Sequence, residues 1–408
     1  MSPRGTVRLG TRGSRLALAQ ARSVAETLED HRYDVELVTV ETTGDQLEDA
    51  LLHELGTTGA FVRDLDLRVL EGELEAAVHS LKDVPTESLE ELVVAAIPPR
   101  GPPGDLLVSP AGHRLEDLPE GATVGTSSLR RGAQLQAIRP DLTIEPLRGN
   151  VDTRLAKLLA PTLQAEYERR VAAFEAENGA GEDDDGRIDN VDESNGEHAG
   201  SGPDPGAFER TPEEWLADRS ELERAALDRE VETAYDAIVL AEVGLRRAGL
   251  ADAVPHARLP VRDAVPAPGQ GALALTARDD DLARHLRDAI DDPRSRVEVT
   301  VERTVLSTLG GGCVAPIGVN AVVQGEVVQT HAQILSRDGT EVIAETRELP
   351  IETHPEAARE LAADLADRGA ATLIERARRD DPAADTSDPA ELPGPARFSD
   401  DPTDGGED

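Results

Sequence analysis

Hydrophobic and polar positions along the first hundred residues follow two alternating periods, one typical of buried strands and the other typical of amphipathic helices. An apolar face that repeats every three to four residues over 14–28 predicts a helix capped by Ser14, and 60–71 predicts another helix. Short apolar runs predict strands at 6–10, 34–40, 75–80 and 91–97. Strands that alternate with helices in this way predict α/β layers with parallel sheets.

The same alternation resumes after the proline-rich stretch 98–104, which we interpret as a hinge. It predicts helices near 128–138 and 150–160, and a second hinge-like stretch at 265–275 leads back into a strand. The expected strand-like segments of this second unit are 122–128, 143–147 and 235–241.

Between Pro161 and Glu232 the periodic pattern fails. The stretch 175–198 holds ten acidic residues against one arginine, with Gly, Asn and Ser between them. Such composition is typical of a solvated segment, so we expect an acidic, largely disordered insertion at about 161–231. Its shoulders at 164–178 and 212–230 are expected to be partly helical. Because it falls between a helix and a strand, we expect a surface excursion that leaves the α/β units intact.

The C-terminal part predicts a smaller α+β unit. A helix within 294–309 is followed by the glycine-rich stretch 310–318, and an amphipathic helix is expected near 355–379. Between them, three strand-like runs lie at 317–323, 326–336 and 340–347. The resulting domain prediction is 1–99 with 270–290, then 104–265, then 293–379, and a disordered acidic tail at 380–408. The fold class is therefore α/β, with two α/β domains and the smaller third domain.

Charge changes the picture of the surface. The chain of 408 residues has 81 acidic and 42 basic residues and a formal net charge of −39. Of the basic residues only Lys82 and Lys157 are lysines, and the rest are arginines. A diffuse acidic surface that nearly lacks lysine resembles the halophilic proteins of archaea, and it argues against nucleic acid or an anionic membrane as a partner.

No apolar run reaches transmembrane length, and the first ten residues lack the hydrophobic core of a signal peptide, so a cytoplasmic location is expected. A single cysteine, Cys313, excludes an internal disulfide and a cysteine-cluster metal site. The chain contains no GxxxxGK[ST] phosphate loop, and LGTRGS does not match GxGxxG. We interpret LGTRGS and PAPGQG as turns, and mononucleotide chemistry is disfavoured.

Four arginines are concentrated in a short region of this acidic chain, each close to the boundary of a predicted element. Guanidinium groups bind carboxylates and phosphates bidentately, and hydroxyls at a helix N-terminus add to such a site. Surface arginines in ordinary helices are the alternative for any one of them. The candidate anion-binding residues of this region are Thr126, Ser127, Ser128, Arg130, Arg131, Arg148 and Arg154. Arg12, after the first strand, lies at a similar junction, where open α/β sheets bind ligands.

Two further features carry candidate chemistry. Lys82 and Asp83 follow the strand at 75–80, and a carboxylate rimmed by cations can stabilise a developing positive charge or move a proton. A solvated ion pair is the alternative. Cys313 follows three glycines, so its thiol is expected to be accessible and able to act as a nucleophile or attachment point. A small buried core residue is the alternative there.

Long segments of the chain resemble the hydroxymethylbilane synthase family, also called porphobilinogen deaminase, in order and spacing. The resemblance covers roughly 1–160 and 232–378. The segments that carry it are LGTRGSRLALAQ, TTGD, AAVHSLKDVPT, VGTSSLRR, LRGNVDTRL, YDAIVLAEVGL, PAPGQGALAL and GGGCVAPIG. It implies two domains like the halves of a type-2 periplasmic binding protein, linked by two crossing strands, and a third domain that carries a covalent cofactor.

The resemblance also implies an activity. The family joins four porphobilinogen molecules head to tail on a dipyrromethane cofactor, loses ammonia at each step, and releases linear hydroxymethylbilane by hydrolysis. By motif, one dipyrromethane per chain would be joined by a thioether to Cys313, and Asp83 would be the catalytic carboxylate that stabilises an azafulvene-like cation. No metal or nucleotide is implied, and a monomer is expected. Cofactor and substrate carboxylates would be bound by Arg12, Ser14, Lys82, Thr126, Ser127, Ser128, Arg130, Arg131, Arg148 and Arg154.

The chain departs from the family pattern in one loop. Many family members have lysines in a glycine-rich loop before the Phe of GAF, whereas 53–61 contains none here, so a contribution of that loop to carboxylate binding is weaker or depends on salt.

A non-catalytic binding protein for an anionic ligand would use the same arginines. It would need neither the Lys82–Asp83 pair nor Cys313, and loss of activity through the missing lysines is a further alternative.

Overall fold

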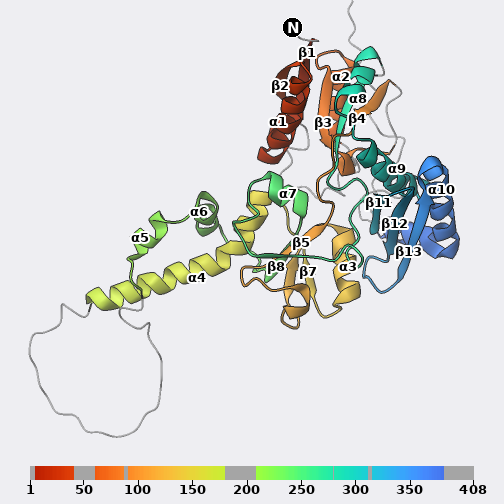
Figure 1. Cartoon of the computed structure of the whole chain (residues 1–408). Helices are drawn as coiled ribbons and strands as arrows, with labels where there is room; N and C mark the ends of the chain where they lie inside the picture. The colour runs from red at the N-terminus through yellow and green to blue at the C-terminus, as the bar shows by residue number, and fades with distance from the viewer. Residues whose placement is uncertain are drawn as a thin grey trace, which may run out of the picture.

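The computed structural model describes residues 5–40, 60–86, 91–179, 208–278, 280–310 and 315–380. They form three sheets with helices around them, at the top, bottom and right of Figure 1. The α/β fold class with a smaller C-terminal α+β unit is confirmed. In the described part of the chain, no helix combines the length and the apolarity that crossing a membrane requires.

The N-terminal sheet has the strand order β2-β1-β3-β10-β4. Its helices are α1 (Arg15–Asp30), α2 (Ala60–Leu70) and α8 (Asp281–Ile290), and α1 begins at the N-cap Ser14 as predicted. Val24 and Leu28 of α1 pack on Val7 and Leu9 in one apolar core. The strands are β1 (Thr6–Arg12), β2 (Asp34–Val40), β3 (Ala76–Ser80), β4 (Leu92–Ala96) and β10 (Leu273–Arg278).

The second sheet has the order β7-β6-β8-β5-β9. Its helices are α3 (Leu129–Ile138), α4 (Val151–Gly179) and α7 (Glu242–Arg247). The strands are β5 (Asp105–Val108), β6 (Thr123–Gly125), β7 (Thr143–Glu145), β8 (Ala237–Ala241) and β9 (His256–Arg258). The sequence analysis did not predict β5, because its four residues directly follow the proline-rich stretch.

The prediction of purely parallel sheets is wrong. In the N-terminal sheet β1 runs parallel to β2 and β3, but β10 runs antiparallel to both β3 and β4. In the second sheet β5 runs antiparallel to β8 and β9. The reason is topological: β5 and β10 each follow a segment that crosses between the two sheets, so neither enters its sheet through a right-handed crossover helix.

The two crossing segments contact each other. The Gly101 amide donates to the Gly271 carbonyl oxygen at 3.1 Å, and Arg247 Nη2 donates to the same oxygen at 3.0 Å. Gly271 has φ +90, and a Cβ there would lie 2.5 Å from Gly101 O. This crossing point therefore requires glycine at 271.

Helix α4 does not end before Pro161 as predicted, and continues to Gly179. Its N-terminal part is anchored by Leu155 and Leu158, which are buried in a core with β5 and β8, and this packing outweighs the hydrogen bond that the proline removes. Figure 1 shows α4 projecting from the body, with α5 (Pro212–Ala217) and α6 (Glu221–Leu227) beside it. The partly helical shoulders predicted at 164–178 and 212–230 are confirmed by α4, α5 and α6. The rest of the predicted disordered part, 180–207, lies outside the described residues.

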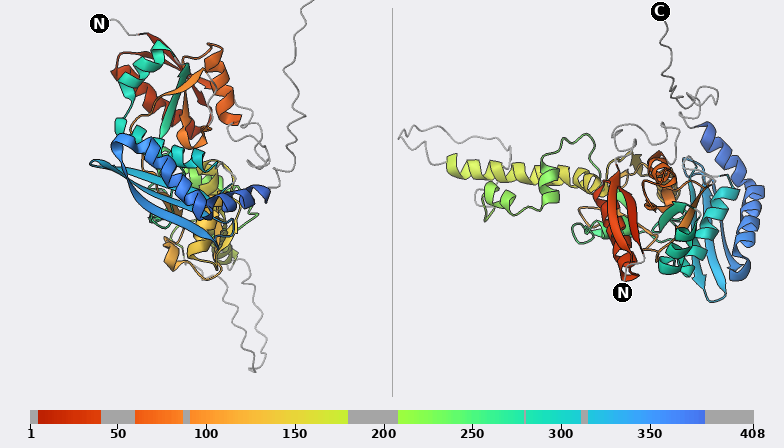
Figure 2. Two further views of the ribbon diagram at one scale, coloured as in Figure 1. Left: turned by 90° about the vertical axis from the view of Figure 1, so that its right-hand side faces the viewer. Right: turned by 90° about the horizontal axis from the view of Figure 1, so that it is seen from above.

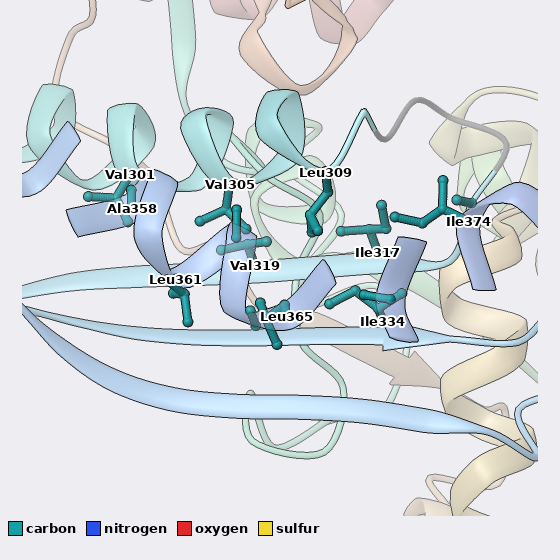
Figure 3. Close-up of a cluster of buried hydrophobic side chains, with 14 of the residues drawn as sticks. Val301, Val305, Leu309, Ile317, Val319, Ile334, Ala358, Leu361, Leu365 and Ile374 are labelled. Atoms are coloured by element: carbon teal, nitrogen blue, oxygen red, sulfur yellow. The ribbon is translucent and has the colours of Figure 1, made fainter. Parts of the chain in front are cut away.

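The C-terminal sheet is antiparallel, in the order β11-β12-β13. Its strands are β11 (Ile317–Gln324), β12 (Val327–Leu335) and β13 (Val342–Pro350), and its helices are α9 (Pro293–Thr308), α10 (His354–Leu365) and α11 (Ala371–Arg379). Val305, Ile317 and Leu361 pack together between the helices and the sheet (Figure 3). Figure 2 shows α10, in blue, lying along these strands. The predicted single helix 355–379 is interrupted at Gly369, whose φ is +107.

Candidate active site

Three predicted site residues lie at one edge of the N-terminal sheet. The parallel register pairs Leu9 of β1 with Ala76 of β3, so both strands end at the same edge. Arg12 is the last residue of β1 and is half-buried. Lys82 and Asp83 follow β3 in a short 3₁₀ helix, Leu81–Asp83, and both side chains are exposed.

The equivalent edge of the second sheet carries most of the other candidates. Thr126, Ser127 and Ser128 follow β6, while Arg148 follows β7 and is half-buried. The Ser127 hydroxyl joins the two loops, because it donates to Leu147 O at 2.8 Å and accepts from Leu147 N at 3.0 Å. Its one hydroxyl hydrogen is therefore already used within the chain, and one acceptor lone pair is left.

An ion pair connects the two edges. Arg15, at the start of α1, lies 3.8 Å from the carboxylate of Asp152 at the start of α4, and α1 also contacts α7. Because each helix begins where its preceding strand ends, this contact brings the carboxyl ends of β1 and β7 toward each other. The predicted residues of the two sheets thus face one region between them.

Three of the predicted hydroxyls serve the local backbone. Ser14 Oγ accepts from Ala17 N at 3.2 Å and caps α1, and Ser128 Oγ accepts from Arg131 N at 3.4 Å and caps α3. Thr126 is buried, and its Oγ1 accepts from Ser128 N at 3.2 Å. These contacts fix the loops in which the arginines stand, and they leave each hydroxyl hydrogen able to donate.

Arg130 and Arg131, in the first turn of α3, share one buried carboxylate. Asp105 accepts from Arg130 Nη2 at 2.9 Å and from Arg131 Nη2 at 2.7 Å. Gln270 Nε2 also donates to Asp105, at 2.9 Å. Burial alone raises the pKa of Asp105, but the charges of Arg131 and Arg130 bring that pKa well below its usual range. Asp105 is therefore ionised and neutralises one of the two arginines.

Arg130 is engaged by the chain on both terminal nitrogens. Besides Asp105, its Nη1 donates to Val265 O at 2.6 Å and to Gln134 Oε1 at 2.9 Å. These bonds tie α3 to the second crossing segment. Arg131 is likewise engaged on both terminal nitrogens, through Asp105 and, at 3.4 Å, Val239 O. The binding of ligand carboxylates by either arginine stays a prediction.

Arg154, in the first turn of α4, is half-buried and carries an unbalanced charge. Its Nε donates to Gly149 O at 2.8 Å, and among the described residues it has no carboxylate partner. Burial and the nearby charge of Arg131 lower its pKa to about 10. Arg130 and Arg131 share the carboxylate of Asp105, and Arg154 lies near Arg131 without a described carboxylate of its own, so among the described residues this cluster has an excess of positive charge.

Two parts of the predicted site lie outside the described residues. They are Cys313, which lies between the end of α9 and Ala315, and the lysine-free loop 53–59. Helix α9 ends at Thr308, so it leads almost directly into the stretch that contains Cys313.

The structure also identifies residues that sequence reasoning missed. Asp105 lies in a short strand after a proline-rich stretch, and only the fold brings it to α3. Arg303 of α9 donates to backbone oxygens on both sides of Lys82 and Asp83. No local sequence signal indicates either contact, because the partners are distant in sequence.

Comparison with known proteins identifies the family. The model for "Porphobilinogen deaminase, dipyromethane cofactor binding domain" matches residues 7–172 and 223–285, and the model for the C-terminal domain of the same family matches 296–368. A solved structure, the ectoine binding protein TeaA of the TeaABC TRAP transporter in the apo state, covers 92% of this chain and 99% of its own at 10% identity, but its TM-score of 0.29 is too low to support an argument.

Curated relatives agree with the family models. The chain is 54% identical to the "Probable porphobilinogen deaminase" of Halobacterium salinarum, over 91% of this chain and 98% of that protein. It is 36% identical to the porphobilinogen deaminase of Acidothermus cellulolyticus, over 90% of this chain and 91% of that protein. It is 38% identical to the porphobilinogen deaminase of Rubrobacter xylanophilus, over 91% of this chain and 97% of that protein. The chain belongs to the porphobilinogen deaminase family.

Proposed function

We propose that Asp83 is the catalytic carboxylate of this hydroxymethylbilane synthase and that Cys313 carries its dipyrromethane cofactor. The chain is a transferase of tetrapyrrole synthesis: it condenses four porphobilinogen molecules head to tail with loss of ammonia and releases the linear hydroxymethylbilane by hydrolysis. The assignment of residues to roles is the proposal, and it rests on the charge and placement of the described side chains.

The observation that carries the proposal is the excess of positive charge around Arg131 and Arg154. A half-buried guanidinium that lies near a second one and has no described carboxylate partner is unfavourable in the free protein, and it becomes favourable when a ligand carboxylate neutralises it. Each porphobilinogen unit carries an acetate and a propionate. The residues present therefore fit dipyrromethane and the chain that grows from it.

We assign the carboxylate-binding role to Arg12, Arg131, Arg148 and Arg154, with Lys82 at the opposite edge. In this arrangement Arg130 supports Arg131 through their shared partner Asp105. The N-caps Ser14 and Ser128 hold the two helix N-termini, where free backbone N–H groups favour anions. Thr126 and Ser127 fix the loop that presents them.

The bound dipyrromethane supplies a pyrrole whose free α-carbon is the nucleophile for the incoming substrate. In each condensation the substrate would lose ammonia as its C–N bond breaks. Asp83 is exposed at the sheet edge, so its carboxylate can stabilise the positive charge that develops as ammonia departs and can accept a hydrogen bond from a pyrrole N–H.

We also infer the coarser properties of the molecule. The three sheets support a division into the three domains predicted from the sequence, with the cleft between the first two. A net charge of −39 opposes association with nucleic acid, with anionic membranes or with other copies, so we infer a cytoplasmic monomer. The chain is strongly acidic, and it is similar to a protein of Halobacterium salinarum. Both observations support adaptation to high salt.

Intact mass measurement tests the cofactor assignment. Wild-type protein is expected to be heavier than its sequence by two pyrrole units and to give a coloured product with Ehrlich's reagent. The variant Cys313→Ser is expected to have the mass of the bare chain and no colour. A wild-type protein at the bare-chain mass, or a Cys313→Ser variant that keeps the added mass, would contradict the assignment.

A further inference from the structure

The turn that carries Lys82 and Asp83 is held at both ends while its two polar side chains stay exposed. Before them, Leu81 is buried and its amide donates to Ala272 O at 3.0 Å. After them, Val84 packs in the same apolar cluster as Leu81. The conformation between these two anchors decides where the Asp83 carboxylate lies.

Arg303 binds the backbone on both sides of this pair. Its Nη1 donates to Val84 O at 2.8 Å and to Leu81 O at 3.3 Å, and its Nη2 donates to Pro85 O at 2.6 Å. The planar guanidinium thus spans the turn with a fixed geometry that a lysine cannot reproduce. Among the described residues Arg303 has no carboxylate partner, so its charge faces carbonyl dipoles.

Arg303 belongs to a face of α9 that supports the catalytic turn. One turn earlier, Val299 packs against Leu81. The adjacent Glu302 accepts from Arg100 Nη1 at 2.8 Å and from the Gly269 amide at 2.7 Å, which fixes α9 to both crossing segments. The same helix ends at Thr308, shortly before Cys313. Helix α9 therefore supports the turn of Lys82 and Asp83 and is itself fixed to both crossing segments.

We propose that Arg303 is a positioning residue, which fixes the Asp83 turn relative to α9. This inference rests on the catalytic role proposed for Asp83. A partly buried arginine without an acid is costly, and a purely structural contact between α9 and the turn would not need a charged group. The charge is explained if the carbonyls must be held in one orientation during catalysis.

The test compares Arg303→Met and Arg303→Lys with the control Arg294→Met. Arg294 lies on the same helix, is exposed and pairs with Glu298, so its loss changes the net charge equally. For each holoenzyme, kcat and KM for porphobilinogen, the intact mass and the thermal unfolding midpoint are measured. In Arg303→Met we expect kcat to fall by about ten- to a hundredfold with KM within about twofold and the cofactor mass retained. Arg303→Lys is expected to lie between Arg303→Met and wild type, and Arg294→Met to match wild type.

Each outcome decides the proposal. A normal kcat in Arg303→Met, with or without a lower unfolding midpoint, overturns it, because Arg303 would then be structural only. If Arg303→Met does not fold, Arg303→Lys decides: a kcat lowered by about threefold or more at unchanged KM supports positioning, and an unchanged kcat overturns it. Full activity in Asp83→Ala removes the catalytic role of Asp83 itself. If Asp83→Ala is inactive but Arg303→Met has a normal kcat, the positioning role of Arg303 is excluded and the catalytic role of Asp83 stands.

Discussion

Arg131 lies close enough to Arg154 that its positive charge, added to the effect of burial, lowers the pKa of the Arg154 guanidinium to about 10. The free protein thus keeps the charge of the buried Arg131 close to that of the half-buried Arg154, with Asp105 as the one described carboxylate that contacts Arg131. Such an arrangement costs folding free energy. In the proposed function, the carboxylates of the bound pyrrole chain neutralise this excess charge.

The first prediction concerns Arg154→Leu. Because the substitution removes an unbalanced, half-buried cation, we expect the unfolding midpoint of the bare chain to stay equal or rise, whereas cofactor assembly or turnover falls by at least about tenfold. Intact mass measures cofactor assembly, and porphobilinogen consumption measures turnover. Arg169→Leu is the control, since Arg169 is an exposed residue of the same helix that pairs with Glu166. A variant with normal turnover would remove Arg154 from the binding site.

The second prediction concerns Asp105→Asn. Loss of this carboxylate leaves Arg130 and Arg131 buried without a counter-charge, so we expect the free energy of unfolding to fall by about 3–5 kcal/mol at pH 7. The stabilisation that Asp105 provides decreases only when the pH is lowered. The pKa of Asp105 is depressed in the folded state, so its stabilisation is complete above the unfolded pKa, roughly 3.9, and is lost as the pH falls through the folded pKa.

Denaturant unfolding between neutral pH and pH 3 measures this difference. The gap in unfolding free energy between wild type and Asp105→Asn is expected to be constant above about pH 5 and to shrink at lower pH. A gap that widens on acidification would show that Asp105 is not the ionised partner of the two arginines.

The third prediction concerns the crossing point of the two linking segments. Gly271→Ala places a Cβ 2.5 Å from the Gly101 carbonyl oxygen at a φ of +90, so the segments must separate. We expect a loss of stability of about 2 kcal/mol or more and a lower kcat, because the two sheets change their relative position. Gly249→Ala is the control: its φ is +69, but no atom lies within 4 Å of the added Cβ. Equal effects in both variants would mean that backbone strain alone, and not the crossing contact, is responsible.

The fourth prediction concerns the projecting helices. Trp215 of α5 is 6% exposed and packs on Tyr167 of α4, with Arg219 over its ring at 4.6 Å. Trp215→Ala is expected to release α5 from α4, which increases proteolysis near Trp215, and to leave kcat and KM unchanged. Limited proteolysis and steady-state kinetics check both parts. A marked loss of kcat would show that this excursion contributes to the active site.

Local pattern predicted much of the fold. Ser14 and Ser128 precede apolar faces and cap the expected helices, and the apolar runs at 34–40 and 317–323 became strands. The prediction failed at Pro161, because tertiary packing of Leu155 and Leu158 carries α4 through the proline. The antiparallel course of β10 was also missed. It depends on where the chain returns after the second sheet, which no short window of sequence contains.

The site was predictable only as a set of residue types. Arginine in an acidic chain indicated an anion site, and Arg131 and Arg154 are indeed neighbours. The partners that determine their charge balance were not predictable, because Asp105 and Arg303 meet their contacts only in the folded chain.

Turnover by Asp83→Ala, measured beside Asp117→Ala, tests the central claim most directly. Asp83 and Asp117 are each the exposed last residue of a three-residue 3₁₀ helix, so the two substitutions disturb the backbone alike. We predict that both variants fold, that Asp117→Ala makes hydroxymethylbilane from porphobilinogen at the wild-type rate, and that Asp83→Ala is nearly inactive. Hydroxymethylbilane formation by Asp83→Ala at the wild-type rate would contradict the account.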